Sequence, residues 1–148
     1  MEYMIRGAKK EDESIIRSLF VEMLRTIYHT DDVEEYEEGY LDRYWTESED
    51  RLFVADNGKV VAYLGVEVHH DEHDYLYLDD LSVTEKCRNM GIGSELIKKA
   101  ESYAKEIGID AVLFHVEKTN EDALRLYERL GYEVFRDDDN RFLLKKDL

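Results

Sequence analysis

A short glycine-containing loop near the middle of the chain has the residue types that bind phosphate. It reads Arg88-Asn89-Met90-Gly91-Ile92-Gly93-Ser94, between an apolar stretch that ends at Val83 and a helical pattern that runs to Ile107. Such a loop directs several backbone N–H groups and a helix N-terminus to one place, where an anion binds without a metal. The alternative is a glycine turn that only opens a helix. The loop by itself leaves both interpretations open.

Two adjacent carboxylates, Asp79 and Asp80, lie in the strand that is expected over residues 75–83. Side chains alternate between the two faces of a strand. The two carboxylates are therefore expected on opposite faces, so that only one of them faces a substrate. One face is expected to carry Tyr75, Tyr77, Asp79, Leu81 and Val83, and the other Leu76, Leu78, Asp80 and Ser82.

Asn120 and Tyr127 are the notable polar residues of a helix expected over residues 120–130. They are seven residues apart, which is two helical turns, so both project from one face of the helix. Asn120 precedes Glu121 and Asp122 and is also a good N-cap for this helix. The alternative for Tyr127 is a packed aromatic side chain, since the chain has 11 tyrosines.

A polar run, His69-His70-Asp71-Glu72-His73-Asp74, raises the question of a metal site. Its spacing matches no ligand motif, and its position between two expected strands favours a hairpin turn. The single cysteine, Cys87, has no disulfide partner and no metal-ligand spacing. An acetyl-cysteine intermediate is set aside because nothing nearby in the sequence activates this thiol. No metal is expected.

The first part of the chain predicts a strand over residues 4–8 and an amphipathic helix over residues 11–28. The acidic segment 30–38 follows, and a second helix is expected to include or follow it. The acidic residues are interpreted as a solvated helix face, and the alternative is a negative rim beside an amine-binding cleft. The opposite side of the expected helix carries Val33, Tyr36, Tyr40, Leu41 and Trp45.

Strands and helices follow one another in the rest of the chain. This order predicts an α/β (α+β) fold with a mixed, mostly antiparallel central sheet flanked by helices. Residues 75–116 form a strand–helix–strand unit, so its two strands are expected to be parallel. The whole of residues 1–148 is expected to be one domain. The expected strands cover 51–55, 59–68, 75–83, 111–116, 132–135 and 141–145, and the expected helices cover 92–107 and 120–130.

The composition narrows the classes of function. The formal net charge is -16, from 36 acidic and 20 basic residues, whereas nucleic-acid binding requires a basic surface. An acidic surface attracts cationic small molecules, although solubility alone also explains most of this charge. No apolar run is long enough for a membrane helix, and the N-terminus lacks an apolar signal segment. A soluble cytoplasmic protein is therefore expected.

Three motifs together resemble the GNAT superfamily of acyl-CoA-dependent N-acyltransferases. They are the loop Arg88-x-x-Gly91-x-Gly93, the strand end Asp80-Leu81-Ser82-Val83, and the later Asn120-x-x-Ala123-x-x-x-Tyr127-x-x-x-Gly131-Tyr132. The order of elements agrees with this superfamily over nearly the whole chain. Residues 77–81 and 91–95 are most similar to its diamine and polyamine acetyltransferases. The resemblance implies a GNAT-like fold with a V-shaped acetyl-CoA cleft between the fourth and fifth strands, and commonly a homodimer.

The resemblance also implies acetyl-CoA as the acetyl donor. Its pyrophosphate is expected on the loop, where Gly91 and Gly93 allow close backbone approach, and its pantetheine arm is expected beside the strand that ends at Val83. Asn120 is expected to hydrogen-bond the pantetheine, and Tyr127 to protonate the departing thiolate. The expected cofactor-binding residues are Leu81, Ser82, Val83, Arg88, Asn89, Met90, Gly91, Ile92, Gly93, Ser94, Asn120 and Tyr127.

An amine acceptor must lose a proton before it attacks a thioester, since a lysine-like amine has a pKa of about 10. Asp79 and Asp80 are the candidate bases, and the resemblance to polyamine acetyltransferases favours Asp79, acting through a water. Those enzymes carry Glu at this position, and the shorter Asp reaches less far. Glu67 and His115 are the fallback candidates.

The activity implied by this resemblance is direct transfer of acetyl from acetyl-CoA to a primary amine. The acceptor is expected to be a small, cationic molecule because of Asp79, Asp80 and the acidic segment 30–38. One alternative is a non-catalytic CoA-sensing or partner-binding domain, and another is an acetyltransferase of protein N-termini or lysines. A mononucleotide-binding domain is disfavoured because no Gly-Lys-Ser/Thr motif is present.

Overall fold

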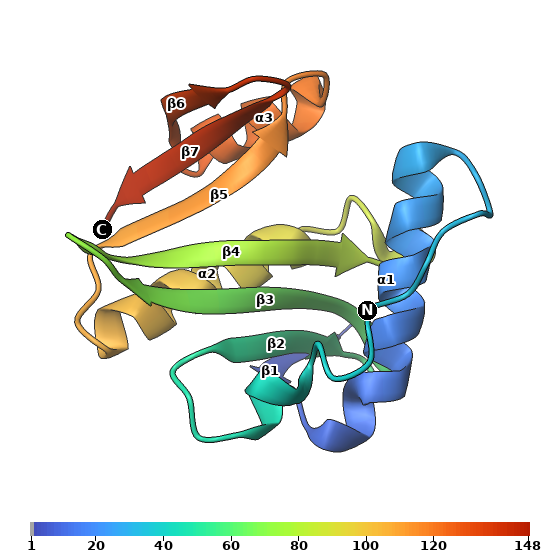
Figure 1. Ribbon diagram of the computed structural model, residues 1–148. Helices are drawn as coiled ribbons and strands as arrows, with labels where there is room; N and C mark the ends of the chain where they lie inside the picture. The colour runs from blue at the N-terminus through green and yellow to red at the C-terminus, as the bar shows by residue number, and fades with distance from the viewer. Residues whose placement is uncertain (1) are drawn as a thin grey trace.

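The computed structural model describes residues 2–148, and these form a seven-stranded sheet with helices on both of its faces (Figure 1). The strand order is β1-β2-β3-β4-β5-β7-β6, and β4 and β5 are the parallel pair in an otherwise antiparallel sheet. The predicted mixed, mostly antiparallel sheet is therefore confirmed. The strands are β1 (Met4–Gly7), β2 (Arg51–Asp56), β3 (Val60–His70), β4 (Asp74–Val83), β5 (Ala111–Glu117), β6 (Glu133–Asp138) and β7 (Arg141–Asp147).

Three α-helices cover the sheet: α1 (Glu13–Tyr28), α2 (Ile92–Glu106) and α3 (Glu121–Arg129). Helix α1 packs on one face, where Ile16 and Leu19 join a core cluster with residues of β2 and β3. Helix α2 lies on the opposite face and crosses between the parallel strands β4 and β5, as the strand–helix–strand unit predicts (Figure 1). No helix among residues 2–148 has the length and apolar character needed to cross a membrane.

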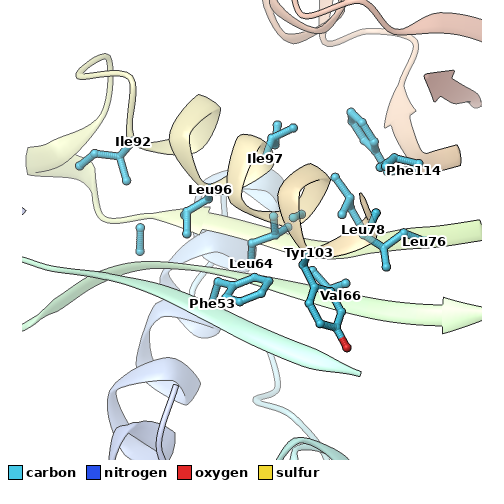
Figure 2. Close-up of a cluster of buried hydrophobic side chains, with 14 of the residues drawn as sticks. Phe53, Leu64, Val66, Leu76, Leu78, Ile92, Leu96, Ile97, Tyr103 and Phe114 are labelled. Carbon is cyan, nitrogen blue, oxygen red and sulfur yellow. The ribbon is translucent and has the colours of Figure 1, made fainter. Parts of the chain in front are cut away.

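The largest core cluster lies between α2 and the sheet (Figure 2). Helix α2 contributes Ile92, Leu96 and Ile97, which recur at helical spacing and are at most 1% exposed. The strands contribute apolar side chains that point to the same face, among them Leu64 and Leu76. Because each residue of this kind adds about 1.5–3 kcal/mol when buried, the cluster fixes α2, and with it the loop at its N-terminus, on the sheet.

The pairing between β4 and β5 is short. It consists of Leu76 with Val112 and Tyr77 with Leu113, and beyond these residues the two strands diverge (Figure 1). Strand β4 therefore continues from Leu78 to Val83 without a paired strand on its β5 side among the described residues. This divergence is the V-shaped opening between the fourth and fifth strands that the GNAT resemblance implies.

A β-bulge changes the side-chain alternation of β4 at Asp80. Leu64 pairs with Leu81, and the next pair along is Gly65 with Asp79, so Asp80 has no opposite residue. Its φ angle of 39° lies in the left-handed region, which non-glycine residues adopt mainly at such irregular positions. The prediction that Asp79 and Asp80 lie on opposite faces is wrong, because the extra residue turns both side chains toward the α1 face.

The segment after α1 does not form the second helix that was expected. Helix α1 ends at Tyr28, and its C-cap His29 has a φ of 53°. The only helical turn that follows in residues 30–50 is the 3-10 turn η2 (Asp42–Trp45). Several glutamates of this segment are three or four residues apart, and such like charges repel each other in a helix. Gly39 adds a backbone with a φ of 81°. The segment instead crosses the sheet as an extended strap, defined here as residues 29–45.

Candidate active site

The predicted phosphate loop forms one wall of a cavity of about 780 Å³, and α3 forms the opposite wall. Gly91 is the N-cap of α2 and has a φ of 80°, which glycine adopts at little cost. The first backbone N–H groups of α2 have no acceptor within the helix, so they are available to an anion. Met90 is 51% exposed and does not line the cavity. Of the expected cofactor-binding residues, this cavity is lined by Val83, Arg88, Asn89, Gly91, Ile92, Gly93, Ser94 and Asn120.

The Arg88 side chain anchors the loop. Its Nε donates to the carbonyl oxygen of Val83 at 3.0 Å, and its Nη2 donates to Glu22 at 3.4 Å. The guanidinium is therefore already paired with the end of β4 and with α1. This arrangement favours a role for Arg88 in holding the loop, with the loop backbone as the anion-binding element.

A second cavity of about 350 Å³ lies where β4 and β5 diverge, and it adjoins the first cavity at Asn120. Asn120 accepts a hydrogen bond from the backbone N–H of Ala123 at 3.3 Å, so it is the N-cap of α3, as its position in the sequence indicates. Leu81 and Tyr127 line the same cavity. Ser82 does not, because its buried hydroxyl donates to the carbonyl of Leu19 at 3.1 Å.

Tyr127 points into the second cavity from α3. Its ring packs edge-to-face on Phe114 of β5, with ring centroids 4.7 Å apart. Burial raises the pKa of its phenol, so the group stays protonated at neutral pH. Its hydroxyl has no hydrogen-bond partner within residues 2–148 and is free to donate to a bound molecule.

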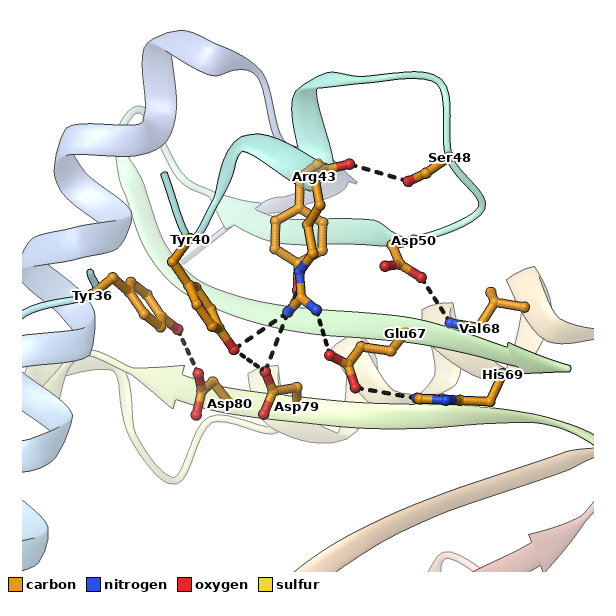
Figure 3. Close-up of polar contacts among 11 residues, drawn as sticks. Tyr36, Tyr40, Arg43, Ser48, Asp50, Glu67, Val68, His69, Asp79 and Asp80 are labelled. Atoms are coloured by element: carbon orange, nitrogen blue, oxygen red, sulfur yellow. Dashed lines mark hydrogen bonds and ion pairs between the residues drawn. The ribbon is translucent and has the colours of Figure 1, made fainter. Parts of the chain in front are cut away.

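Asp79 and Asp80 both line the second cavity. Each accepts a hydrogen bond from a tyrosine of the strap (Figure 3). Tyr40 donates to Oδ2 of Asp79 at 2.8 Å, and Tyr36 donates to Oδ2 of Asp80 at 2.6 Å. Burial raises the pKa of Asp79, an effect opposed by its hydrogen bond from Tyr40 and by the positive charge of Arg43. Burial and the neighbouring charge of Asp79 raise the pKa of Asp80 to about 6. Asp80 thus titrates closer to neutral pH than a free aspartate does.

Arg43, in η2, joins the strap to the carboxylates of β3 and β4 (Figure 3). One guanidinium nitrogen donates to Glu67, and the other lies 3.5 Å from Asp79 and 2.7 Å from the hydroxyl of Tyr44. Sequence reasoning missed Tyr36, Tyr40 and Arg43 as site residues. No local signal identifies them, because each contact joins positions that are 24 to 44 residues apart.

A chain of hydrogen bonds that runs from Tyr77 through His115 to Asp138 also starts in the second cavity. The Tyr77 hydroxyl lies 2.6 Å from Nδ1 of His115, and Nε2 of His115 lies 2.8 Å from Oδ2 of Asp138. Hydrogen bonds from Arg136 and His115 hold the pKa of Asp138 well below its usual range, so Asp138 is ionised and accepts from Nε2–H. With Nε2–H donating to Asp138 in the neutral form of the ring, Nδ1 is the acceptor and Tyr77 donates to it. His115, a fallback base in the sequence, is part of this chain.

The polar run between β3 and β4 forms the expected hairpin turn. His70 and Asp74 are the last pair of the two strands, and His70 also contacts Glu49 at 2.6 Å. No group of three or more His, Cys, Asp or Glu side chains in the described part of the chain is arranged to hold a metal ion. Cys87 is buried in the wall of the first cavity.

The chain belongs to the acetyltransferase (GNAT) family, whose family model matches residues 16–132. A mycothiol acetyltransferase of Corynebacterium efficiens is 30% identical over 90 residues, which are 61% of this chain and 30% of that protein. An uncharacterized N-acetyltransferase of Methanocaldococcus jannaschii is 29% identical over 141 residues, which are 88% of this chain and 61% of that protein. The chain thus spans between about a third and three-fifths of the length of these relatives.

Solved structures support the same fold. The PaiA N-acetyltransferase of Thermoplasma acidophilum, solved in complex with coenzyme A, superposes with a TM-score of 0.80 over 100% of both chains at 18% identity. A GNAT-family acetyltransferase of Staphylococcus aureus superposes with a TM-score of 0.82 over 99% of both chains at 16% identity. The fold that the sequence predicts is therefore confirmed. The roles of the individual site residues stay predictions.

The raised pKa of Asp80 predicts a pH-dependent effect of Asp80→Asn on stability. An unfolded aspartate has a pKa of about 3.9, and the folded value is about 6. Between these values the unfolded chain releases the proton first, so ionisation of Asp80 lowers the free energy of unfolding as pH rises, by at most about 3 kcal/mol. Asparagine cannot ionise. We therefore expect the difference in melting temperature, Asp80→Asn minus the unmodified chain, to be more positive at pH 8 than at pH 4.5.

The control is Asp110→Asn, which removes an exposed aspartate outside both cavities. Thermal melts followed by circular dichroism at both pH values measure the effect. An Asp80→Asn difference that is the same at pH 4.5 and pH 8 would contradict the raised pKa.

Proposed function

We propose that the chain is an acetyl-CoA-dependent N-acetyltransferase that transfers acetyl directly to a primary amine. The observation that carries this proposal is the second cavity, which brings Tyr127, Asn120 and the carboxylates of Asp79 and Asp80 around one space. That space adjoins, at Asn120, the first cavity beside the glycine loop, which is called the phosphate cavity below. A donor with phosphates at one end and a thioester at the other fits this pair of cavities.

The described residues fit acetyl-CoA at three points. The free N–H groups at the start of α2 suit the pyrophosphate. The backbone of β4 beyond Tyr77 has no strand beside it on the β5 side, so its polar groups can pair with the amides of the pantetheine arm. Asn120 lies at the junction of the two cavities, beside the expected path of this arm. The thioester then lies near Tyr127.

The carboxylates act on the amine in this proposal. Asp79, whose charge Arg43 stabilises, binds the incoming ammonium group. Asp80 accepts a proton from the amine, through a water, because a base works best when its pKa lies near the working pH. The amine lone pair then attacks the thioester carbonyl, a C–N bond forms and the C–S bond breaks. The second proton that the nitrogen loses in this step replaces the one that Tyr127 gives to the sulfur. This proposal moves the base from Asp79, which the resemblance to polyamine acetyltransferases favours, to Asp80.

Tyr127 completes the reaction at the sulfur. Its hydroxyl is protonated and unpaired in the described structure, so it can donate to the departing thiolate as negative charge develops. The Tyr77–His115–Asp138 chain offers an alternative proton acceptor. A proton taken up at the Tyr77 oxygen would be balanced by transfer of the Tyr77 proton to His115, whose positive charge Asp138 would stabilise.

The acceptor in this proposal is a small, cationic amine. Its support is the position of Asp79 and Asp80 in the cavity wall and the formal net charge of -16. An assay that detects free thiol should show acetyl-CoA turnover with at least one amine in a panel of polyamines, monoamines, amino acids and peptides with free N-termini. Turnover with peptides alone would favour protein N-termini as acceptors. Acetyl-CoA binding without turnover on any amine would favour a non-catalytic CoA-sensing domain.

Tyr127→Phe tests the proposed acid. The variant keeps the aromatic packing on Phe114 and removes the hydroxyl, so kcat should fall by about 10²-fold while the Kd of acetyl-CoA changes little. Tyr3→Phe is the matched control, because Tyr3 packs against the core outside both cavities. An unchanged kcat in Tyr127→Phe would remove this residue from the mechanism.

A further inference from the structure

Two faces of helix α3 line two different cavities. Asn120 and Tyr127 point to the second cavity, while Asp122, Arg125 and Arg129 line the phosphate cavity. Positions 122, 125 and 129 are three and four residues apart, which places their side chains on one face of the helix. Two arginines therefore lie across the cavity from the glycine loop.

These two arginines differ from Arg88 in what they already contact. The guanidinium of Arg88 is engaged by Val83 and Glu22. Arg129 has no hydrogen bond or ion pair with any residue in the range 2–148. Arg125 pairs with Asp122 on the helix surface, where the two side chains are 61% and 93% exposed. Exposed ion pairs of this kind contribute little to stability, so Arg125 can readily leave Asp122 for a stronger partner.

The inference rests on the proposed function, in which the donor is acetyl-CoA. The negative charge of this donor indicates what the two arginines bind. Coenzyme A carries a 3′-phosphate on its ribose in addition to the pyrophosphate. The N–H groups of the loop can serve the pyrophosphate, but they leave the 3′-phosphate without a partner. This dianion must also approach a chain with a formal net charge of -16. A guanidinium binds phosphate through two parallel hydrogen bonds.

We propose that Arg125 and Arg129 bind the 3′-phosphate of coenzyme A and make the chain select coenzyme A over 3′-dephospho-coenzyme A. Arg125 exchanges Asp122 for the phosphate, and Arg129 supplies a guanidinium with no competing contact. The two arginines act on donor affinity and take no part in the chemical step.

Isothermal titration calorimetry with coenzyme A and with 3′-dephospho-coenzyme A tests this selection directly. The unmodified chain should bind coenzyme A at least about tenfold more tightly. Arg129→Gln, and more fully the double variant Arg125→Gln/Arg129→Gln, should bring the affinity for coenzyme A down to that for the dephospho form. The affinity for 3′-dephospho-coenzyme A should stay within about twofold of its original value.

Arg25→Gln is the matched control, because it removes the same charge from an exposed position on α1 outside the phosphate cavity. It should leave the preference for coenzyme A unchanged. Equal binding of both ligands by the unmodified chain would overturn the inference while the proposed function stands. An equal loss of affinity for both ligands in the arginine variants would also overturn it, because the contact would then be with the pyrophosphate. Binding of neither ligand would overturn the proposed function itself.

Discussion

The rest of the site depends on where the pairing of β4 with β5 stops. Only Leu76 and Tyr77 of β4 have partners in β5, although β4 continues to Val83. Had the ladder continued, β5 would occupy the edge of β4 along which a pantetheine arm could pair, and no cavity would separate the two strands. The two strands remain part of one sheet through these pairs, and α2, which joins them, packs its apolar face across the sheet. The opening is thus a feature of the sheet itself.

The bulge at Asp80 determines the chemistry that this opening can support. It brings two carboxylates to one wall of the cavity, where burial raises the pKa of both. The strap contacts Asp79 directly through Tyr40 and Arg43, whereas its hydrogen bond to Asp80 comes from Tyr36, so the two carboxyl groups have different polar partners. A pair of acids held in different environments can divide substrate binding and proton transfer between them.

Local sequence signals predicted the parts of the site that depend on local structure. The N-cap at Asn120, the glycine loop before α2 and the helical spacing of Tyr127 each follow from residues within one or two turns. The bulge was missed because an alternating pattern does not reveal an inserted residue when both positions are aspartates. The strap was predicted to be a helix because its apolar residues have helical spacing, whereas contacts such as Tyr36 with Asp80 join distant segments.

The central claim is that Asp80 accepts the proton of the amine, and the pH dependence of kcat/KM tests it most directly. The account predicts an ascending limb with a midpoint near 6 in the unmodified enzyme. This limb should disappear in Asp80→Asn, with a loss of about 10²-fold in kcat/KM, and should persist in His115→Asn. Persistence of the limb in Asp80→Asn together with its loss in His115→Asn would contradict the account and assign the proton to the Tyr77–His115–Asp138 chain.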